Sequence, residues 1–138
     1  MSNLFHVKHL LNMDNLDVGK IGESRAEELL KSKGYSILEK NYNIPGGEID
    51  IITRRGRTIC FIEVKTSLET RRADFLPEQR VNRRKQQKLK NLSQIYMKRK
   101  KLDQNYGWQI DIISVIIDND GNLVHIDHIE NAVWESQY

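Results

Sequence analysis

The spacing of hydrophobic residues predicts a helix followed by three strands in the first half of the chain. Apolar residues recur on one side of a helix that Asp14 or Asp17 can cap and that Gly34 ends. Runs rich in β-branched and aromatic residues then predict strands over 35–40, 48–53 and 58–67. We expect 41–47, which contains proline and glycine, to be a loop, and we expect a hairpin turn within 54–57.

The second half of the chain predicts a long helix followed by two more strands. Hydrophobic residues recur every three or four positions over about 78–101, and Lys85 lies within this apolar side of the helix. Strands are expected over 108–118 and 123–129, and 69–77 is expected to be a mobile polar loop.

The resulting order of elements, α-β-β-β-α-β-β, favours an α/β sandwich with one central mixed sheet. The first three strands can form an antiparallel meander. The long helix is then a crossover that brings the fourth strand back parallel, with right-handed connectivity. We therefore expect the sheet to be flanked by helices.

Length and composition predict one soluble, cytoplasmic domain. The 138 residues suit a single core, which we place at 14–138; residues 1–13 are expected to be an extension, either disordered or a start-site addition. No run approaches the ~20 apolar residues that span a bilayer, and no signal-peptide pattern is present. The single cysteine, Cys60, cannot form an intramolecular disulfide, which is typical of a reducing cytoplasm.

Basic residues concentrate in the middle of the chain, although the net charge is only +3. Between 54 and 101 there are 16 Lys and Arg against 4 Asp and Glu, a net +12, whereas the other residues have 6 against 15, a net −9. Such a region can neutralise several phosphates, and a solvated helix face is the alternative. The residues that we expect to contact nucleic acid are Arg54, Arg55, Arg57, Arg83, Arg84, Lys85 and Lys88.

Two carboxylates and a lysine are predicted to meet on neighbouring strands. Glu63 and Lys65 lie two residues apart on a strand and therefore point to the same face. Asp50 shares that face if the hairpin loop has an even number of residues. A turn at 55–56, or a four-residue loop around it, pairs Asp50 with Phe61 and makes Glu63 a diagonal neighbour.

A divalent cation is the expected partner of these acids. Charges on a mostly apolar sheet are costly without a counter-ion, and Mg²⁺ or Mn²⁺ held by Asp50 and Glu63 supplies one. Lys65 beside the metal can orient or deprotonate the attacking water and offset charge on the phosphate. With Glu23 on the preceding helix, these are the parts needed for phosphodiester hydrolysis. The alternatives are a structural ion-pair cluster and, for Glu23, a simple helix-dipole role.

Several segments follow one another in an order that is highly specific: Gly19–Ala26 with Gly34-Tyr35, Gly47–Ile52, Phe61–Thr66, Lys85 and His128–Ala132. On these segments the chain resembles the PD-(D/E)XK nuclease-like fold and, within it, the uncharacterised YraN-like family of small bacterial proteins. The resemblance implies a restriction-endonuclease-like three-layer α/β sandwich, metal ligation by Asp50 and Glu63, and a catalytic Lys65. It also implies that Glu23 is a helix-borne acid of the site, similar to that of archaeal Holliday junction resolvases, and a further metal ligand.

These features lead to one preferred function and two alternatives. We expect an endonuclease-like protein, dependent on Mg²⁺ or Mn²⁺, that acts on DNA in branched, repair or recombination structures. The alternatives are a non-catalytic nucleic-acid-binding adaptor and a protein-interaction module. We expect no membrane partner, and symmetric cutting of two strands would call for a homodimer.

The sequence leaves two positions open for Lys85 and argues against a metal site between His125 and His128. Lys85 either runs its stem along the edge of the core or reaches the site or a phosphate with its ammonium group. His125 and His128 lie on opposite faces of a strand, so a metal shared between them is not expected.

Overall fold

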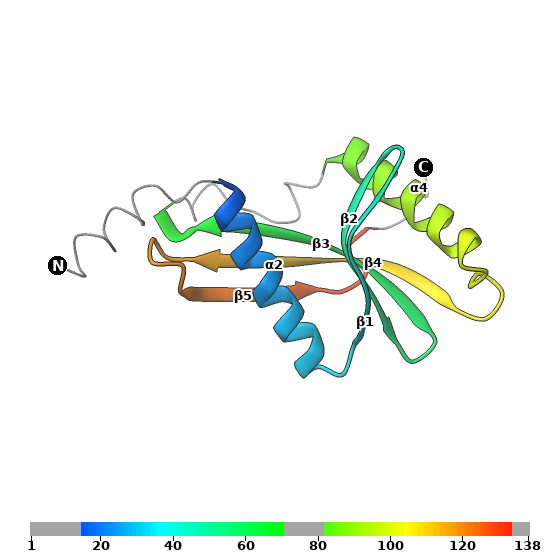
Figure 1. The fold of residues 1–138 in the computed structure, drawn as a ribbon, viewed down its shortest axis with the longest axis horizontal. Coiled ribbons are helices and arrows are strands. Elements are labelled where there is room, and N and C mark those ends of the chain that lie inside the picture. The colour runs from blue at the N-terminus through cyan, green and yellow to red at the C-terminus, as the bar shows by residue number, and fades with distance from the viewer. Residues whose placement is uncertain (1–14, 71–81, 134–138) are drawn as a thin grey trace.

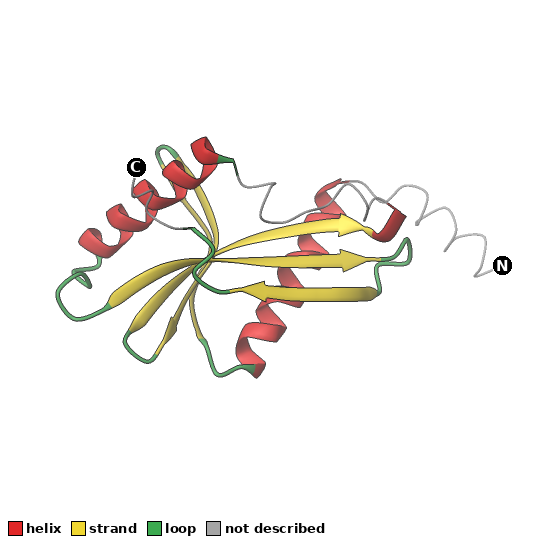
Figure 2. Ribbon diagram, turned by 180° about the vertical axis from the view of Figure 1, so that it is seen from behind, coloured by secondary structure: helices red, strands yellow, loops and turns green. Residues whose placement is uncertain are grey.

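Five strands form one mixed sheet between two helices (Figures 1 and 2). The computed structural model describes residues 15–70 and 82–133. The elements are α2 (Asn15–Ser32), β1 (Ser36–Ile44), β2 (Gly47–Arg55), β3 (Thr58–Leu68), α4 (Arg83–Arg99), β4 (Gly107–Ile117) and β5 (Leu123–Ile129). The strands lie in the order β1-β2-β3-β4-β5, and all neighbours are antiparallel except β3 and β4. The predicted sandwich, its element order and the parallel return of the fourth strand are confirmed; the predictions for 1–13 and 71–81 lie outside the described residues.

The first helix, α2, ends at the predicted glycine. Gly34 has a φ of 86°, and the N–H groups of Gly34 and Tyr35 donate to carbonyls of the last helical turn. This arrangement satisfies carbonyls that the end of a helix would otherwise leave unpaired. At the other end the helix already includes Asp17 in its first turn, so Asp17 is not the cap, and Asp14 lies outside the described residues.

Gly22 determines how closely α2 approaches β3. A Cβ at Gly22 would overlap the side chain of Thr66, whereas a Cβ at Gly19 would meet nothing within 4 Å. Any larger residue at Gly22 would move the helix away from the sheet, and with it the neighbouring Glu23. The core on this side consists of Ala26, Leu30, Tyr35, Ile51, Cys60, Ile62, Ile113, Val115 and Ile117.

The predicted loop at 41–47 is wrong, because most of it is strand. β1 continues to Ile44, and only Pro45 and Gly46 separate it from β2. Gly46 and Gly47 have φ values of 109° and 149°, which favour glycine over other residues. Pairing with β2 therefore extends along the whole polar segment, and the proline and glycine signals mark only its turn.

The predicted register of β2 and β3 is also wrong, by two residues. The turn consists of Gly56 and Arg57, with Gly56 at a φ of 60°, so that Arg55 pairs with Thr58. Phe61 consequently pairs with Ile52, and not with Asp50. Since a shift of two residues leaves the faces of the sheet unchanged, Asp50 and Glu63 still belong to the same face.

The second helix, α4, covers the opposite face of the sheet and begins later than predicted. Asn82 lies outside the helix, and its side chain accepts a hydrogen bond from the N–H of Lys85 at 2.9 Å. Asparagine is a favourable N-cap, so the helix begins at Arg83 and not near Glu78. The core on this side consists of Ile44, Ile49, Ile52, Ile59, Phe61, Leu89, Leu92, Tyr96, Met97, Ile110, Ile112 and Val133.

Two findings bear on the expected absence of a membrane-spanning helix and on the single cysteine. Within 15–70 and 82–133, none of the helices has the length and apolar character needed to cross a membrane. Cys60 is a free, buried cysteine. Burial raises the pKa of its thiol to about 12, so the thiolate is scarce at neutral pH.

Candidate metal and nucleic-acid site

The candidate site lies where β2 separates from β3. The last pair between these strands is Ile51 with Ile62, whereas β2 stays paired with β1 as far as Gly47. Figure 1 shows the β1–β2 hairpin curving out of the sheet toward α4. Asp50 is the first residue beyond the separation, and its Oδ2 accepts a hydrogen bond from the N–H of Val64 at 2.8 Å. A carboxylate thus takes the place of the strand carbonyl that would otherwise pair with this N–H.

Glu63 is the first residue of β3 beyond the last β2–β3 pair, as Asp50 is the first residue of β2 beyond it. If the pairing continued by one step, Glu63 would be opposite Asp50 and not diagonal to it. Only 5% of Glu63 is exposed, although it is an acid. Its side chain shares a face with Phe61, on the side of the sheet that α4 covers.

Two further acids and an amide complete the group. Glu23 reaches it from α2 and Glu48 from the start of β2. The side-chain amide of Asn41, with its nitrogen directed at these acids, donates to Glu48 Oε1 at 3.1 Å and to Glu23 Oε2 at 3.3 Å. Asn41 has a φ of 50°, a value that asparagine tolerates better than most residues. We refer to Glu23, Glu48, Asp50 and Glu63 as the acidic cluster.

Burial and the charges of neighbouring acids raise the pKa of two members of the acidic cluster, Asp50 and Glu23. Burial, the charge of Glu63 and the charge of Glu23 raise the pKa of Asp50 to about 7, against the opposing effects of the Val64 N–H and Lys85. The pKa of Glu23 is also raised, by burial and by the charges of Glu48 and Glu63. At neutral pH the cluster therefore carries more negative charge than its surroundings stabilise.

Two lysines approach the same oxygen of Glu63. Lys65 Nζ lies 3.4 Å and Lys85 Nζ 3.2 Å from Glu63 Oε1. Of the two alternatives for Lys85, its ammonium group reaches the acidic cluster. Because Lys65 comes from β3 and Lys85 from α4, the cluster connects the sheet to the helix.

A cavity of about 240 Å³ opens beside the acidic cluster, between α2 and the β1–β2 hairpin. It is large enough for several water molecules or a hydrated ion. Its walls are formed by Lys20, Glu23, Ser24, Glu27, Lys40, Asn41, Asp50 and Ile51.

The oxygen atoms of Asp50 and Glu63 fit a hard divalent cation. Asp50 Oδ2 and Glu63 Oε1 are already held by an N–H group and by ammonium groups. The second oxygen of each carboxylate has no hydrogen bond within the described parts of the chain. Mg²⁺ and Mn²⁺ prefer carboxylate and water oxygens, so these two acids are the residues that could hold such an ion. Glu23, Asp50 and Glu63 do not form a group of three whose ligand oxygens all lie within 4.8 Å of one another, so the structure does not bring the predicted third ligand into place.

The structure separates the predicted basic residues into two groups. Arg54, Arg55 and Arg57 lie at the β2–β3 turn; Arg55 is five residues from Asp50, about 17 Å along the strand. The other group, Arg83, Arg84, Lys85 and Lys88, lies in the first half of α4. Only this second group is next to the acidic cluster, through Lys85.

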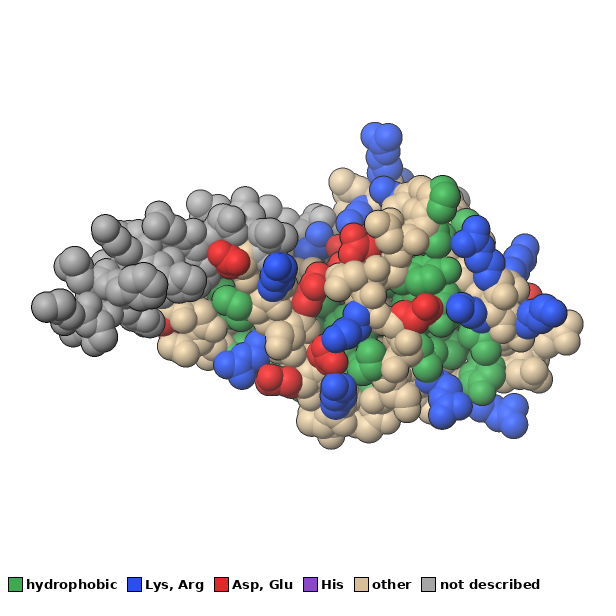
Figure 3. Space-filling view, viewed as in Figure 1, with side chains coloured by type: hydrophobic (Ala, Val, Ile, Leu, Met, Phe, Trp, Pro, Cys, Tyr) green, Lys and Arg blue, Asp and Glu red, His purple; other side chains and the backbone are tan. Residues whose placement is uncertain are grey.

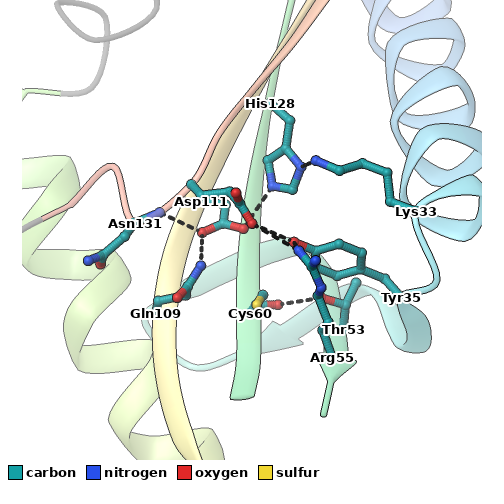
Figure 4. Close-up of polar contacts among 10 residues, drawn as sticks. Lys33, Tyr35, Thr53, Arg55, Cys60, Gln109, Asp111, His128 and Asn131 are labelled. Carbon is teal, nitrogen blue, oxygen red and sulfur yellow. Dashed lines mark hydrogen bonds and ion pairs between the residues drawn. The ribbon is translucent and has the colours of Figure 1, made fainter. Parts of the chain in front are cut away.

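A second polar network, on the other face of the sheet, was not predicted from the sequence (Figure 4). Asp111 is completely buried on β4, and its carboxylate accepts hydrogen bonds from the Asn131 N–H and from Gln109 Nε2, both at 2.8 Å. The His128 ring donates to it from Nε2, also at 2.8 Å. Lys33 Nζ donates to His128 Nδ1 at 2.7 Å, which links the end of α2 to β5.

This network includes the one group of three His and acidic residues close enough to share an ion in 15–70 and 82–133. The ligand atoms of Asp111, His128 and Glu130 lie within 4.8 Å of one another. Glu130 Oε1, however, accepts from Tyr35 at 2.8 Å and pairs with Arg55 at 3.3 Å. Each charge has a partner, so the network is a structural connection. Its members are up to 95 residues apart in sequence, and only the polar residues within the apolar runs of β4 and β5 could have indicated it.

These features define the class of protein, which is an α/β sandwich with an acidic site where two central strands diverge. The chain belongs to the uncharacterised protein family UPF0102, whose profile matches residues 22–115, and the resemblance to the YraN-like family is confirmed. A UPF0102 protein of Dictyoglomus turgidum is 39% identical over 121 residues, covering 87% of this chain and 99% of that protein. One of Thermodesulfovibrio yellowstonii is 44% identical over 122 residues, covering 88% and 100%. One of Clostridium botulinum is 36% identical over 121 residues, covering 86% and 94%.

Proposed function

We propose that this chain is a metal-dependent endonuclease-like protein that hydrolyses phosphodiester bonds, with DNA as its substrate. The observation that supports the proposal most is the acidic cluster, in which burial and the charge of Glu63 raise the pKa of Asp50 to about 7. A fold retains such repulsion at a cost, and strongly perturbed groups of this kind concentrate at functional sites.

Each residue of the site has a distinct role in this proposal. Asp50 and Glu63 hold Mg²⁺ or Mn²⁺, and Glu23 adds negative charge from α2 without completing the ligands, because no three acids of the cluster, all within the described residues 15–70, have ligand oxygens within 4.8 Å of one another. A divalent ion in this position supplies Lewis-acid polarisation of the phosphate and a more acidic bound water. Lys65, whose side chain is 26% exposed, orients the attacking water and stabilises charge that develops on the phosphate. Lys85 neutralises part of Glu63 and directs an ammonium group toward the substrate side.

The charge of α4 supports nucleic acid as the substrate. The helix has seven Lys and Arg residues and no Asp or Glu. Arg83, Arg84 and Lys85 occupy its first turn, where the helix dipole disfavours cations. A phosphate group bound there would relieve this repulsion and would lie beside Lys85, the residue that contacts the acidic cluster.

Cleavage assays test the proposal directly. Purified protein is incubated with branched, nicked and single-stranded DNA in Mg²⁺ or Mn²⁺, and with EDTA as a control. We expect metal-dependent cleavage that is abolished in Asp50→Asn and Lys65→Ala and retained in Glu28→Gln, an exposed acid on α2. Equal inactivity of the wild type and all variants on every substrate would contradict a nuclease. Double-strand breaks in place of nicks would support a homodimer on DNA.

A non-catalytic nucleic-acid-binding adaptor is the second candidate. It is favoured by the two lysines on Glu63 Oε1, since these ion pairs already neutralise part of the cluster without a metal. The adaptor would bind DNA with an affinity that falls steeply with salt and does not change with EDTA. Binding measured across a salt series, with and without chelator, separates it from the nuclease.

A further inference from the structure

A groove lies between the turn of the β1–β2 hairpin and the first half of α4. Its volume is about 610 Å³, within the range of sites that take small molecules. Figure 3 shows hydrophobic side chains exposed in this part of the surface with Lys and Arg side chains around them. The groove is lined by Pro45, Gly46, Arg84, Gln87, Lys88, Asn91, Leu92 and Ile95.

Glycine allows the hairpin turn to lie directly against α4. A Cβ at Gly47 would come within 2.6 Å of Lys88 Cε and within 3.2 Å of Leu92 Cδ1. A Cβ at the neighbouring Gly46 would lie 3.9 Å from Leu92. The groove is therefore a built contact between two elements whose apposition depends on the absence of side chains from the turn.

The lining combines three kinds of chemistry. Ile95 is a hydrophobic residue that is 38% exposed, and Pro45 is a second apolar residue of the lining. Gln87 Nε2 donates to Asn91 Oδ1 at 3.0 Å, which leaves the Gln87 carbonyl and the Asn91 amino group for a ligand. Neither Arg84 nor Lys88 forms an ion pair with an acid of 15–70 or 82–133.

The groove is separate from the cavity beside the acidic cluster but lies close to the candidate site along both β2 and α4. Gly47 and Asp50 are three residues apart on β2, about 10 Å along an extended strand. On α4, Lys88 follows Lys85 by less than one turn, and Lys85 contacts Glu63. A polynucleotide covers this distance in about three nucleotides at B-DNA spacing, and in fewer when it is extended.

We propose that this groove binds an unpaired nucleotide of the DNA next to the phosphate held at the acidic cluster, an inference that rests on the proposed function. The base lies against Ile95 and Pro45, its polar edge meets Gln87 and Asn91, and Arg84 and Lys88 contact the adjoining phosphates. The substrate class is therefore DNA with a single-stranded part, such as a flap or a splayed junction.

The lining favours an unpaired strand over a blunt duplex. A duplex presents phosphates and sugars to a protein surface and keeps the faces of its bases stacked. Its bases therefore cannot contact the apolar residues of the groove. A single strand offers base faces and phosphates together, which matches a surface that alternates apolar residues and cations.

Fluorescence anisotropy with labelled DNA tests the inference, in EDTA so that no cleavage occurs. We compare a single strand, a duplex with an overhang and a blunt duplex, for wild type, Arg84→Ala/Lys88→Ala and Ile95→Ser. The matched control, Arg54→Ala/Arg57→Ala, removes two cations from the distant turn. Because the first double variant removes two cations that contact phosphates, we expect it to lose tenfold or more in affinity for the single strand, which corresponds to about 1.4 kcal/mol or more.

The outcomes separate this inference from the proposed function. A wild-type preference for the single strand and the overhang, lost in the α4 variants and kept in the control, supports the groove. Equal losses in both double variants, or equal wild-type binding to blunt duplex and single strand, would overturn it. Metal-dependent cleavage with intact binding in the groove variants would refute only the groove. Groove-dependent binding without cleavage would refute only the nuclease, and circular dichroism shows whether each variant is folded.

Discussion

Replacing Asp50 with asparagine is expected to stabilise the fold while removing its activity. Asparagine has nearly the same shape, and its Oδ1 can still accept the hydrogen bond that Val64 N–H gives to Asp50 at 2.8 Å. The substitution therefore removes one negative charge from the acidic cluster and leaves the packing of β2 intact.

The magnitude follows from the pKa of Asp50, which is about 7 in the fold against an ordinary value of 3.8. A tenfold change in an ionisation constant corresponds to 1.36 kcal/mol, so the difference is roughly 4 kcal/mol as a ceiling. Since the folded state binds this proton more tightly than the unfolded state does, the group lowers stability as pH rises. The penalty is absent below about pH 4, grows through the range to about pH 7, and is complete above it.

Urea unfolding at pH 4 and pH 8 measures the effect. Asp50→Asn should unfold at higher urea than wild type at pH 8, with an unchanged slope, and at nearly the same urea at pH 4. Mn²⁺ should stabilise the wild type at pH 8, by about 2.7 kcal/mol at a hundredfold excess over the dissociation constant, and should stabilise the variant much less. Glu28→Gln, on the exposed side of α2, is the control. A variant that is destabilised equally at both pH values would refute the electrostatic account of the cluster.

Three further predictions concern the fold. Gly22→Ala should destabilise the protein by about 1–3 kcal/mol by pushing α2 off β3, whereas Gly19→Ala should gain up to about 1 kcal/mol; equal effects in urea unfolding would contradict the close packing. Asp111→Asn and His128→Ala should each cost about 2–4 kcal/mol, and the double variant should cost less than the two together; additive losses would mean that the pair is not coupled. Cys60, whose pKa burial raises to about 12, should resist iodoacetamide at pH 8 until the protein unfolds, and rapid labelling of the folded protein by mass spectrometry would argue against its burial.

Parity along a strand predicts the face of each residue in the paired part of β3, but it fails in β2 around Asp50, where Ile51 packs on the α2 side and Ile49 on the α4 side. Glu63 lies on the α4 side with Phe61, and Ile62 lies on the α2 side. The predicted turn at 55–56 is wrong, but the observed turn at Gly56-Arg57 also has two residues. The predicted faces of the paired residues are therefore unchanged. The register itself was not predictable, because a glycine can occupy either central position of a two-residue turn and the flanking arginines fit both.

The polar contacts between distant elements were harder to predict than the strands. Asn41 was assigned to a loop, yet its amide holds Glu23 of α2 to Glu48 of β2. The sequence pattern places His125 and His128 on opposite faces of a strand, but it does not predict that His128 pairs with Asp111 on β4. Such contacts depend on which strands become neighbours and on how far the hairpin curves. The pattern of residues in a single sequence predicts neither of these.

Asp50, which is partly buried, and Asp111, which is fully buried, differ in how many hydrogen-bond donors surround them. Asp111 receives three hydrogen bonds at 2.8 Å, from a backbone N–H, an amide and an imidazole. Asp50 receives one, from Val64, and its other neighbours include the carboxylates of Glu63 and Glu23, which raise its pKa. A fold that needed Asp50 only for structure would gain stability by supplying it with donors, as it does for Asp111. A carboxylate with a single donor, whose neighbouring lysines pair with Glu63 and not with Asp50 itself, supports the proposal that a bound cation supplies the missing positive charge.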